Sequence, residues 1–68
     1  MTLYDTAYEY NWEKWGDKYI REKARYSILI DVHTKTCYIQ VNNLEVDLLA
    51  GLKTTQMIQL MKMFGAKL

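Results

Sequence analysis

Residues 26–42 decide the fold, and their sequence is YSILIDVHTKTCYIQVN. Apolar side chains alternate with other side chains on both sides of a short polar segment, and this period of two is typical of β-strands. The polar segment, residues 31–35, fits a type I turn that is closed by a bulge residue at Lys35. The stretch therefore predicts a two-stranded antiparallel hairpin.

The predicted turn also fixes which residues of the two strands face each other. Three pairs then share one face of the hairpin: Ile30 with Cys37, Ile28 with Ile39, and Tyr26 with Val41. A correct register brings the apolar residues of both strands to the same side, so this agreement supports the prediction. The opposite face carries Leu29 and Tyr38 among polar neighbours, and we expect it to meet solvent or a partner.

Upstream of the hairpin, residues 4–23 carry a stripe of aromatic side chains. Spacings of 4, 4, 3 and 4 residues place the stripe within an arc of about 80° on a helix that turns 100° per residue. The stripe consists of Tyr4, Tyr8, Trp12, Trp15 and Tyr19. Gly16 would cost such a helix about 1 kcal/mol relative to alanine. The pattern predicts one long N-terminal helix that covers the hairpin.

Downstream of the hairpin, residues 54–65 predict a C-terminal amphipathic helix. Its apolar side chains occupy an arc of about 160° and are Met57, Ile58, Leu60, Met61, Phe64 and Leu68. Thr54 is a candidate N-cap and Gly65 a candidate C-cap. Residues 44–49, which precede this helix, fit either a short helix or a third strand, and the spacing of their leucines favours the helix.

These elements combine into one α+β domain over residues 1–68. A chain of 68 residues buries only about 60% of the surface that it exposes when unfolded. Half of the residues are apolar and 13% are aromatic, which is enough for a core with apolar surface to spare. We therefore expect a homodimer, or a docked partner protein, to complete the burial.

The sequence also indicates where the protein acts. Its single cysteine fits a reducing compartment. The N-terminus lacks the basic start and apolar run of a signal peptide, and the longest apolar runs are three residues long. We expect a whole gene product that is cytoplasmic and has no membrane partner. The net charge of +1 predicts no strong attraction to phosphate backbones.

Few residues are suited to catalysis or metal binding. Ser27 lies within a predicted strand, away from any sharp exposed turn. His33 and Cys37 are the only nucleophilic combination, but a cysteine that points into an apolar core is inert. Asp31 could join these two residues as a metal ligand, although its more ordinary role is to stabilise the turn. The sequence predicts no enzyme, no metal and no cofactor.

A protein-interaction module is the function that these features favour. Aromatic residues and methionine are common contact residues, and the candidates for partner binding are Tyr4, Tyr10, Leu29, Tyr38 and Met63. By composition the chain is of the kind found among phage and mobile-element accessory proteins, which inhibit or redirect host proteins. We expect such a module to act by steric occupation of its partner.

A small nucleic-acid-binding regulator is the alternative. On the predicted N-terminal helix four basic residues form a stripe: Lys14, Lys18, Arg21 and Arg25. This stripe would extend about 16 Å at 1.5 Å per residue and could follow a phosphate backbone. Asp17 and Glu22 interrupt the stripe, and the same residues would also suit a solvated flank of the helix.

Overall fold

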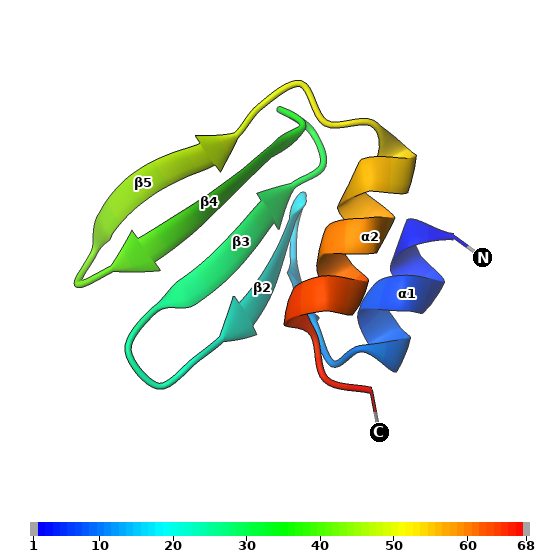
Figure 1. Cartoon of the computed structure of the whole chain (residues 1–68), viewed down its shortest axis with the longest axis horizontal. Coiled ribbons are helices and arrows are strands. Elements are labelled where there is room, and N and C mark those ends of the chain that lie inside the picture. Colours follow the sequence, from blue (N-terminus) through cyan, green and yellow to red (C-terminus); the bar gives the residue numbers. More distant parts are fainter. Residues whose placement is uncertain (1, 68) are drawn as a thin grey trace.

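Five antiparallel strands form one sheet in which each strand pairs with the next along the chain, and two helices lie on one face of that sheet (Figure 1). This computed structural model describes residues 2–67, apart from the side chain of Asp47. The elements in chain order are α1 (Leu3–Glu9), β1 (Glu13–Trp15), β2 (Lys18–Glu22), β3 (Ser27–Asp31), β4 (Thr36–Val41), β5 (Leu44–Leu49) and α2 (Thr54–Phe64). The fold is a helix layer on an antiparallel sheet.

The prediction of a long N-terminal helix was wrong. Helix α1 has a capping box at Thr2 and Asp5, but it ends at Glu9. Asn11 follows with a φ of 65°, and Gly16 has a φ of 60°, a conformation that glycine adopts without a steric penalty. Gly16 lies in the two-residue turn between β1 and β2. The aromatic spacing fits a helix, but these two backbone positions divide the segment into a short helix and a hairpin.

The central hairpin has the predicted register, but it is part of a larger sheet. Ile30 pairs with Cys37 and Ile28 pairs with Ile39. Lys35 has the positive φ, 60°, that a bulge residue after a type I turn requires. The prediction of a two-stranded hairpin, with residues 44–49 left open as a possible third strand, was wrong about the size of the sheet, because β1 and β2 pair on one side of this hairpin and β5 on the other.

Residues 44–49, for which the leucine spacing favoured a helix, form strand β5. Asn42 and Asn43 make the two-residue turn between Val41 and Leu44, with φ values of 51° and 67°. Positive φ at both central positions is the mark of a type I′ hairpin turn, which asparagine tolerates better than most residues. This turn carries the chain directly back into the sheet as an edge strand.

Helix α2 spans the predicted segment with one change at its start. Its N-cap is Lys53 rather than Thr54, and its C-cap is Gly65, as predicted. A Cβ atom on Gly65 would lie 2.5 Å from the Met61 carbonyl oxygen and 2.7 Å from the Trp12 indole nitrogen. Glycine is therefore required here by close packing. Leu68, assigned to the apolar arc of this helix, lies outside the described residues.

The core lies between the two helices and the middle of the sheet. Its buried members are Ala7, Trp12, Tyr19, Ile28, Ile30, Cys37, Leu52, Met57 and Met61. The indole nitrogen of Trp12 donates a buried hydrogen bond of 3.0 Å to the Met61 carbonyl oxygen. The backbone nitrogen of Ala66 donates to the Tyr10 carbonyl oxygen at 3.0 Å. These bonds connect the two ends of the chain.

Candidate interaction surface

The helix-facing side of the sheet is covered over only part of its width. Ile28 and Ile30 of β3 lie beneath the helices and are 1% and 0% exposed. In Figure 1 both helices lie to the right of β2 and β3, and β4 and β5 lie at the left of the sheet. Cys37 of β4 is 1% exposed, whereas Val41 at the other end of β4 is 38% exposed, so the covered part of the sheet ends within β4.

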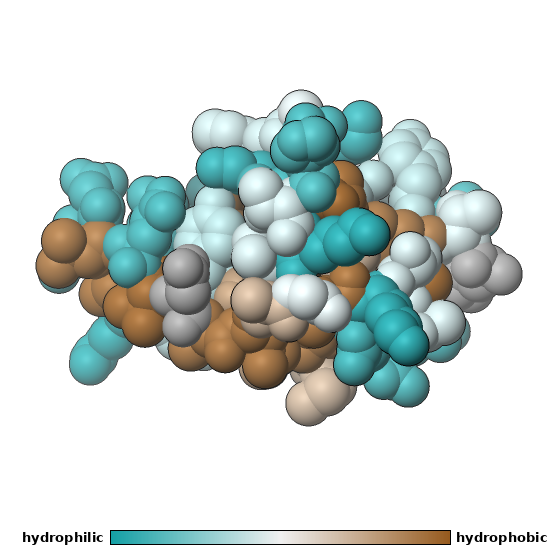
Figure 2. All heavy atoms as spheres, turned by 90° about the horizontal axis from the view of Figure 1, so that it is seen from above, coloured by the Kyte–Doolittle hydropathy of each residue, from teal (hydrophilic) through white to brown (hydrophobic). Residues whose placement is uncertain are grey.

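The uncovered part of the sheet is apolar. Because Val46 pairs with Ile39 and Leu49 pairs with Cys37, strand alternation places them on the helix-facing side. We define the open face as Val41, Leu44, Val46 and Leu49, which are 38%, 71%, 53% and 45% exposed. Figure 2 shows hydrophobic atoms along this side of the molecule. Isolated exposed apolar residues are ordinary, but a contiguous apolar area indicates a contact surface.

Helix α2 buries one side against the core. Met57 and Met61 point to the core, and Leu60 and Phe64 are half-buried against the same core cluster. At 100° per residue, Leu60 and Phe64 lie on one flank of this buried side, and Ile58 lies on the other. The four side chains of the open face nevertheless stay exposed.

Two of the predicted partner-binding residues are not accessible. Leu29 and Tyr38 pair directly with each other on the outer face of the sheet, and each is only 5% exposed. Ile20 of β2 lies opposite Leu29, and the Lys18 ammonium lies 5.7 Å from the centre of the Tyr38 ring. Cross-strand neighbours therefore cover this pair, which corrects the expectation that the outer face is free there.

The other predicted contact residues are dispersed. Tyr4 is exposed on α1, and Met63 is exposed on α2. Tyr10 is half-buried and packs against the core. These three residues therefore lie outside β4 and β5, which carry the open face.

The basic stripe of the alternative function does not form. Lys14 and Arg21 lie on the helix-facing side of β1 and β2, Lys18 lies on the outer face, and Arg25 lies in the turn before β3. The Arg21 guanidinium donates a hydrogen bond of 3.3 Å to the Asn11 carbonyl oxygen. The grouping depended on a helix, and with strands in its place these cations point to different sides.

The nucleophilic and metal-ligand candidates also separate. The Asp31 carboxylate accepts hydrogen bonds from the backbone nitrogens of His33 and Thr34 at 2.9 and 3.1 Å, so it stabilises the turn. Cys37 is buried on the helix-facing side, and this burial raises the pKa of its thiol. Within residues 2–67, no three His, Cys, Asp or Glu side chains are grouped as metal ligands.

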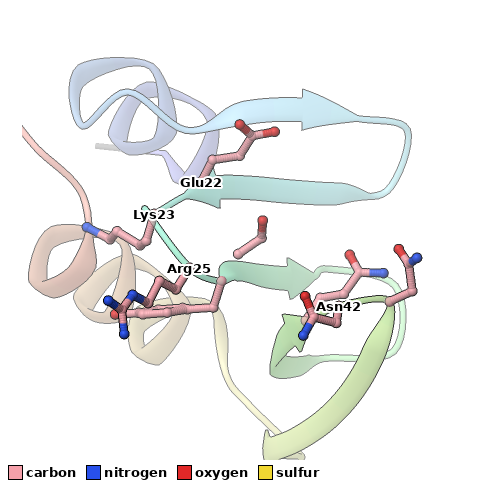
Figure 3. A pocket seen from close by; sticks show the side chains of 8 residues that line it. Glu22, Lys23, Arg25 and Asn42 are labelled. Carbon is pink, nitrogen blue, oxygen red and sulfur yellow. The ribbon is translucent and has the colours of Figure 1, made fainter.

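A polar hollow of about 240 Å³ lies where the β2–β3 and β4–β5 turns meet, and it is lined by Glu22, Lys23, Arg25, Asn42 and four neighbouring residues. Figure 3 shows the side chains of Lys23 and Arg25 directed away from those of Glu22 and Asn42. The Lys23 ammonium donates to the Phe64 carbonyl oxygen at 2.8 Å. Because these charges diverge, the hollow is a weaker candidate than the open face.

The residues of the open face are not among the contact residues predicted from the sequence. Two signals could have found them: the Asn42–Asn43 pair, which is typical of a two-residue hairpin turn, and the alternation of apolar and acidic residues from Leu44 to Leu48.

Comparisons with protein families, curated proteins and solved structures found no match for this chain. In the part of the chain that the structure describes, the helices are too short or too polar to cross a bilayer.

Proposed function

We propose that this protein is a small interaction module that binds another protein, or a second copy of itself, through the open face. The observation that carries the proposal is the open face on β4 and β5, whose four apolar side chains are between 38% and 71% exposed. Removing apolar area from water is the main driving force of protein association.

The module acts by covering a surface of its partner. The open face offers apolar contact area and the unpaired backbone edge of β5, and both are features that bind other proteins. The single cysteine supports a site of action in a reducing compartment. Burial disfavours the nucleophilic form of Cys37, which supports binding rather than covalent chemistry.

A photocrosslinking experiment in cells that make the protein tests this function. A photoreactive phenylalanine analogue replaces Leu44 on the open face in one variant and Tyr8 in a control. Tyr8 is 80% exposed on α1, so the control probe is equally accessible but lies away from the open face. We expect one discrete crosslinked protein, or a covalent dimer, from position 44 only. Equal crosslinking from both positions, or none from position 44, would contradict the proposal.

A further inference from the structure

We infer that the partner is an extended segment of another protein, which adds to β5 as a further strand and alternates basic with apolar side chains; this inference rests on the proposed function. Strand β5 is the last in the order of the sheet, and in Figure 1 it lies at the left edge, away from both helices. It has six residues, against three in β1 at the other edge. A sheet edge of this length presents backbone groups to which an extended peptide can hydrogen-bond.

The turn before β5 determines which of its backbone groups point outward. Val41 and Leu44 flank this two-residue turn, and such a turn closes with a hydrogen bond between its flanking residues. Hydrogen-bonded and non-hydrogen-bonded pairs alternate along an antiparallel ladder, so Leu44 and Val46 bond to β4. The backbone N–H and C=O groups of Glu45 and Asp47 then point away from β4. An added strand would therefore form its hydrogen bonds with positions 45 and 47.

The two sides of β5 differ in chemistry, and the difference defines the segment that fits. Leu44 and Val46 belong to the apolar open face. Glu45 pairs with Gln40 on the other side of the sheet, where it is exposed and makes no ion pair with the described residues. Side chains of an added strand alternate between the same two sides. A matching segment therefore places apolar residues beside the open face and basic residues beside Glu45.

A second copy of β5 does not match this edge. Antiparallel pairing of β5 with itself, apolar side beside apolar side, sets position 45 opposite position 45 or 47 of the second copy, or position 47 opposite position 47. Both positions are acidic in the sequence, and like charges directly opposite each other destabilise a strand pair. The edge therefore disfavours its own copy and favours a basic segment.

A bulge in β5 sets the length of the segment. Cys37 pairs with Leu49 and Tyr38 pairs with Asp47, so Leu48 is an extra residue opposite β4. A bulge bends its strand and interrupts the ladder. Regular strand addition is therefore confined to residues 44–47, and a segment of about six residues spans them.

Amide hydrogen exchange of the isotope-labelled protein tests strand addition. The probe is a capped peptide of about six residues in which lysine and valine alternate, and the control peptide has glutamate in place of lysine. In the free protein, the amides of Glu45 and Asp47 should exchange faster than that of Val46. The lysine peptide should slow exchange at positions 45 and 47 by about tenfold. No protection at about 1 mM peptide, or equal protection by the glutamate peptide, would overturn the inference.

Two substitutions at position 45 separate the backbone bond from the charge. Glu45→Pro removes an N–H that β4 does not use, which an edge strand tolerates, and peptide binding should fall about tenfold. Glu45→Gln keeps the N–H but removes the charge, and binding should fall about two- to fivefold. Glu22→Gln removes an exposed acid of β2 and is the control that should leave binding unchanged. Should Glu45→Pro fail to fold, unchanged binding by Glu45→Gln would still overturn the inference.

Photocrosslinking from position 44 separates this inference from the proposed function. Mass spectrometry identifies the segment of the captured protein that carries the crosslink. We expect that segment to alternate basic and apolar residues. A segment without this alternation, or a covalent dimer of this chain, would overturn the inference and leave the proposed function standing. No capture from position 44 would overturn both.

Discussion

The two halves of the helix-facing side of the sheet have the same kind of side chains but different surroundings. On β3, Ile28 and Ile30 lie under the helices and are almost fully buried, whereas on β5 Leu44 and Val46 are more than half exposed. Strand alternation alone places apolar residues on this side in both halves. The difference shows that strand pattern determines which side chains face the helix layer, and the length and position of the helices determine how many are covered.

The largest expected difference between the halves is in stability. Ile30→Ala should lower the free energy of unfolding by about 2–5 kcal/mol, because it leaves a cavity under the helices. Val46→Ala should change it by about 0.5 kcal/mol or less at concentrations where the protein is monomeric. Urea denaturation followed by tryptophan fluorescence measures both. Should Ile30→Ala fail to fold, Ile28→Val, at about 0.5–1.5 kcal/mol, provides the milder test, and equal losses at positions 28 and 46 would remove the distinction.

The two tryptophans offer a matched comparison of a covered and an uncovered hydrogen bond. The Trp12 indole donates to the Met61 carbonyl oxygen in the core, whereas the exposed Trp15 indole donates to the Glu13 carboxylate at 3.2 Å. Trp12→Phe removes one of two hydrogen bonds that the Met61 carbonyl oxygen accepts, since the Gly65 backbone nitrogen also donates to it at 2.9 Å, and should cost about 1 kcal/mol. Trp15→Phe should cost about 0.5 kcal/mol or less. Thermal unfolding monitored by far-UV circular dichroism compares them, and equal shifts would show that the Trp12 bond is not needed.

The hairpin at residues 26–42 was predictable because two independent signals agree there. Alternation gives the strands, and the turn from Asp31 to Lys35 gives the register, so an error in one would have conflicted with the other. The amphipathic helix α2 was predictable for the same reason, because Gly65 follows directly after its apolar residues Met57 to Phe64 and ends the helix. These elements were predictable because the pattern of apolar residues agrees with the turn or cap residues that end each segment.

The N-terminal half was not predictable from periodicity alone. The spacing of Tyr4, Tyr8, Trp12, Trp15 and Tyr19 fits a helix, yet Tyr19 lies on a strand and Trp12 on the loop before β1. Their contacts are with residues distant in the sequence, such as Ile30, which pairs with Tyr19. Asn11 and Gly16 are the residues that favour the correct division, because both adopt a positive φ more readily than most residues.

The same limit applies to the candidate site. Leu29 and Tyr38 are buried by neighbours on another strand, such as Ile20 and Lys18 of β2, and Val46 is exposed because the helix layer does not cover β5. Neither the burial nor the exposure can be predicted from the sequence of the strand that carries the residue. Composition predicts an apolar surplus, but the location of that surplus depends on which strands the two helices cover.

Alkaline pH should weaken the covered half through Cys37. Burial raises the pKa of this thiol in the folded protein, so near pH 9 the unfolded chain has lost a proton that the folded chain retains. Stability is therefore complete below the pKa of the unfolded thiol, about 8.5, and falls as pH rises above it, by at most about 1.4 kcal/mol per pH unit. Urea unfolding at pH 7.5 and 9.5 measures this loss. Cys37→Ala should be less stable at both values but show a smaller difference between them, and an unchanged difference would assign the effect to another group.

The smallest effect on stability, and the most informative for function, is expected at Val46. Val46→Thr retains β-branching and the strand preference of the residue and replaces one exposed methyl group with a hydroxyl. The free energy of unfolding of the monomer should change by about 0.5 kcal/mol or less. If the open face is a contact surface, however, the same change places a hydroxyl where it loses water, and binding should weaken severalfold.

Ile39→Thr is the matched control on the partner strand. Ile39 pairs with Val46 but packs against the core, so this substitution should mainly lower the free energy of unfolding. A loss of stability at Val46 as large as at Ile39 would mean that the open face is already covered within one protomer, and the distinction between the two halves of the sheet would no longer hold.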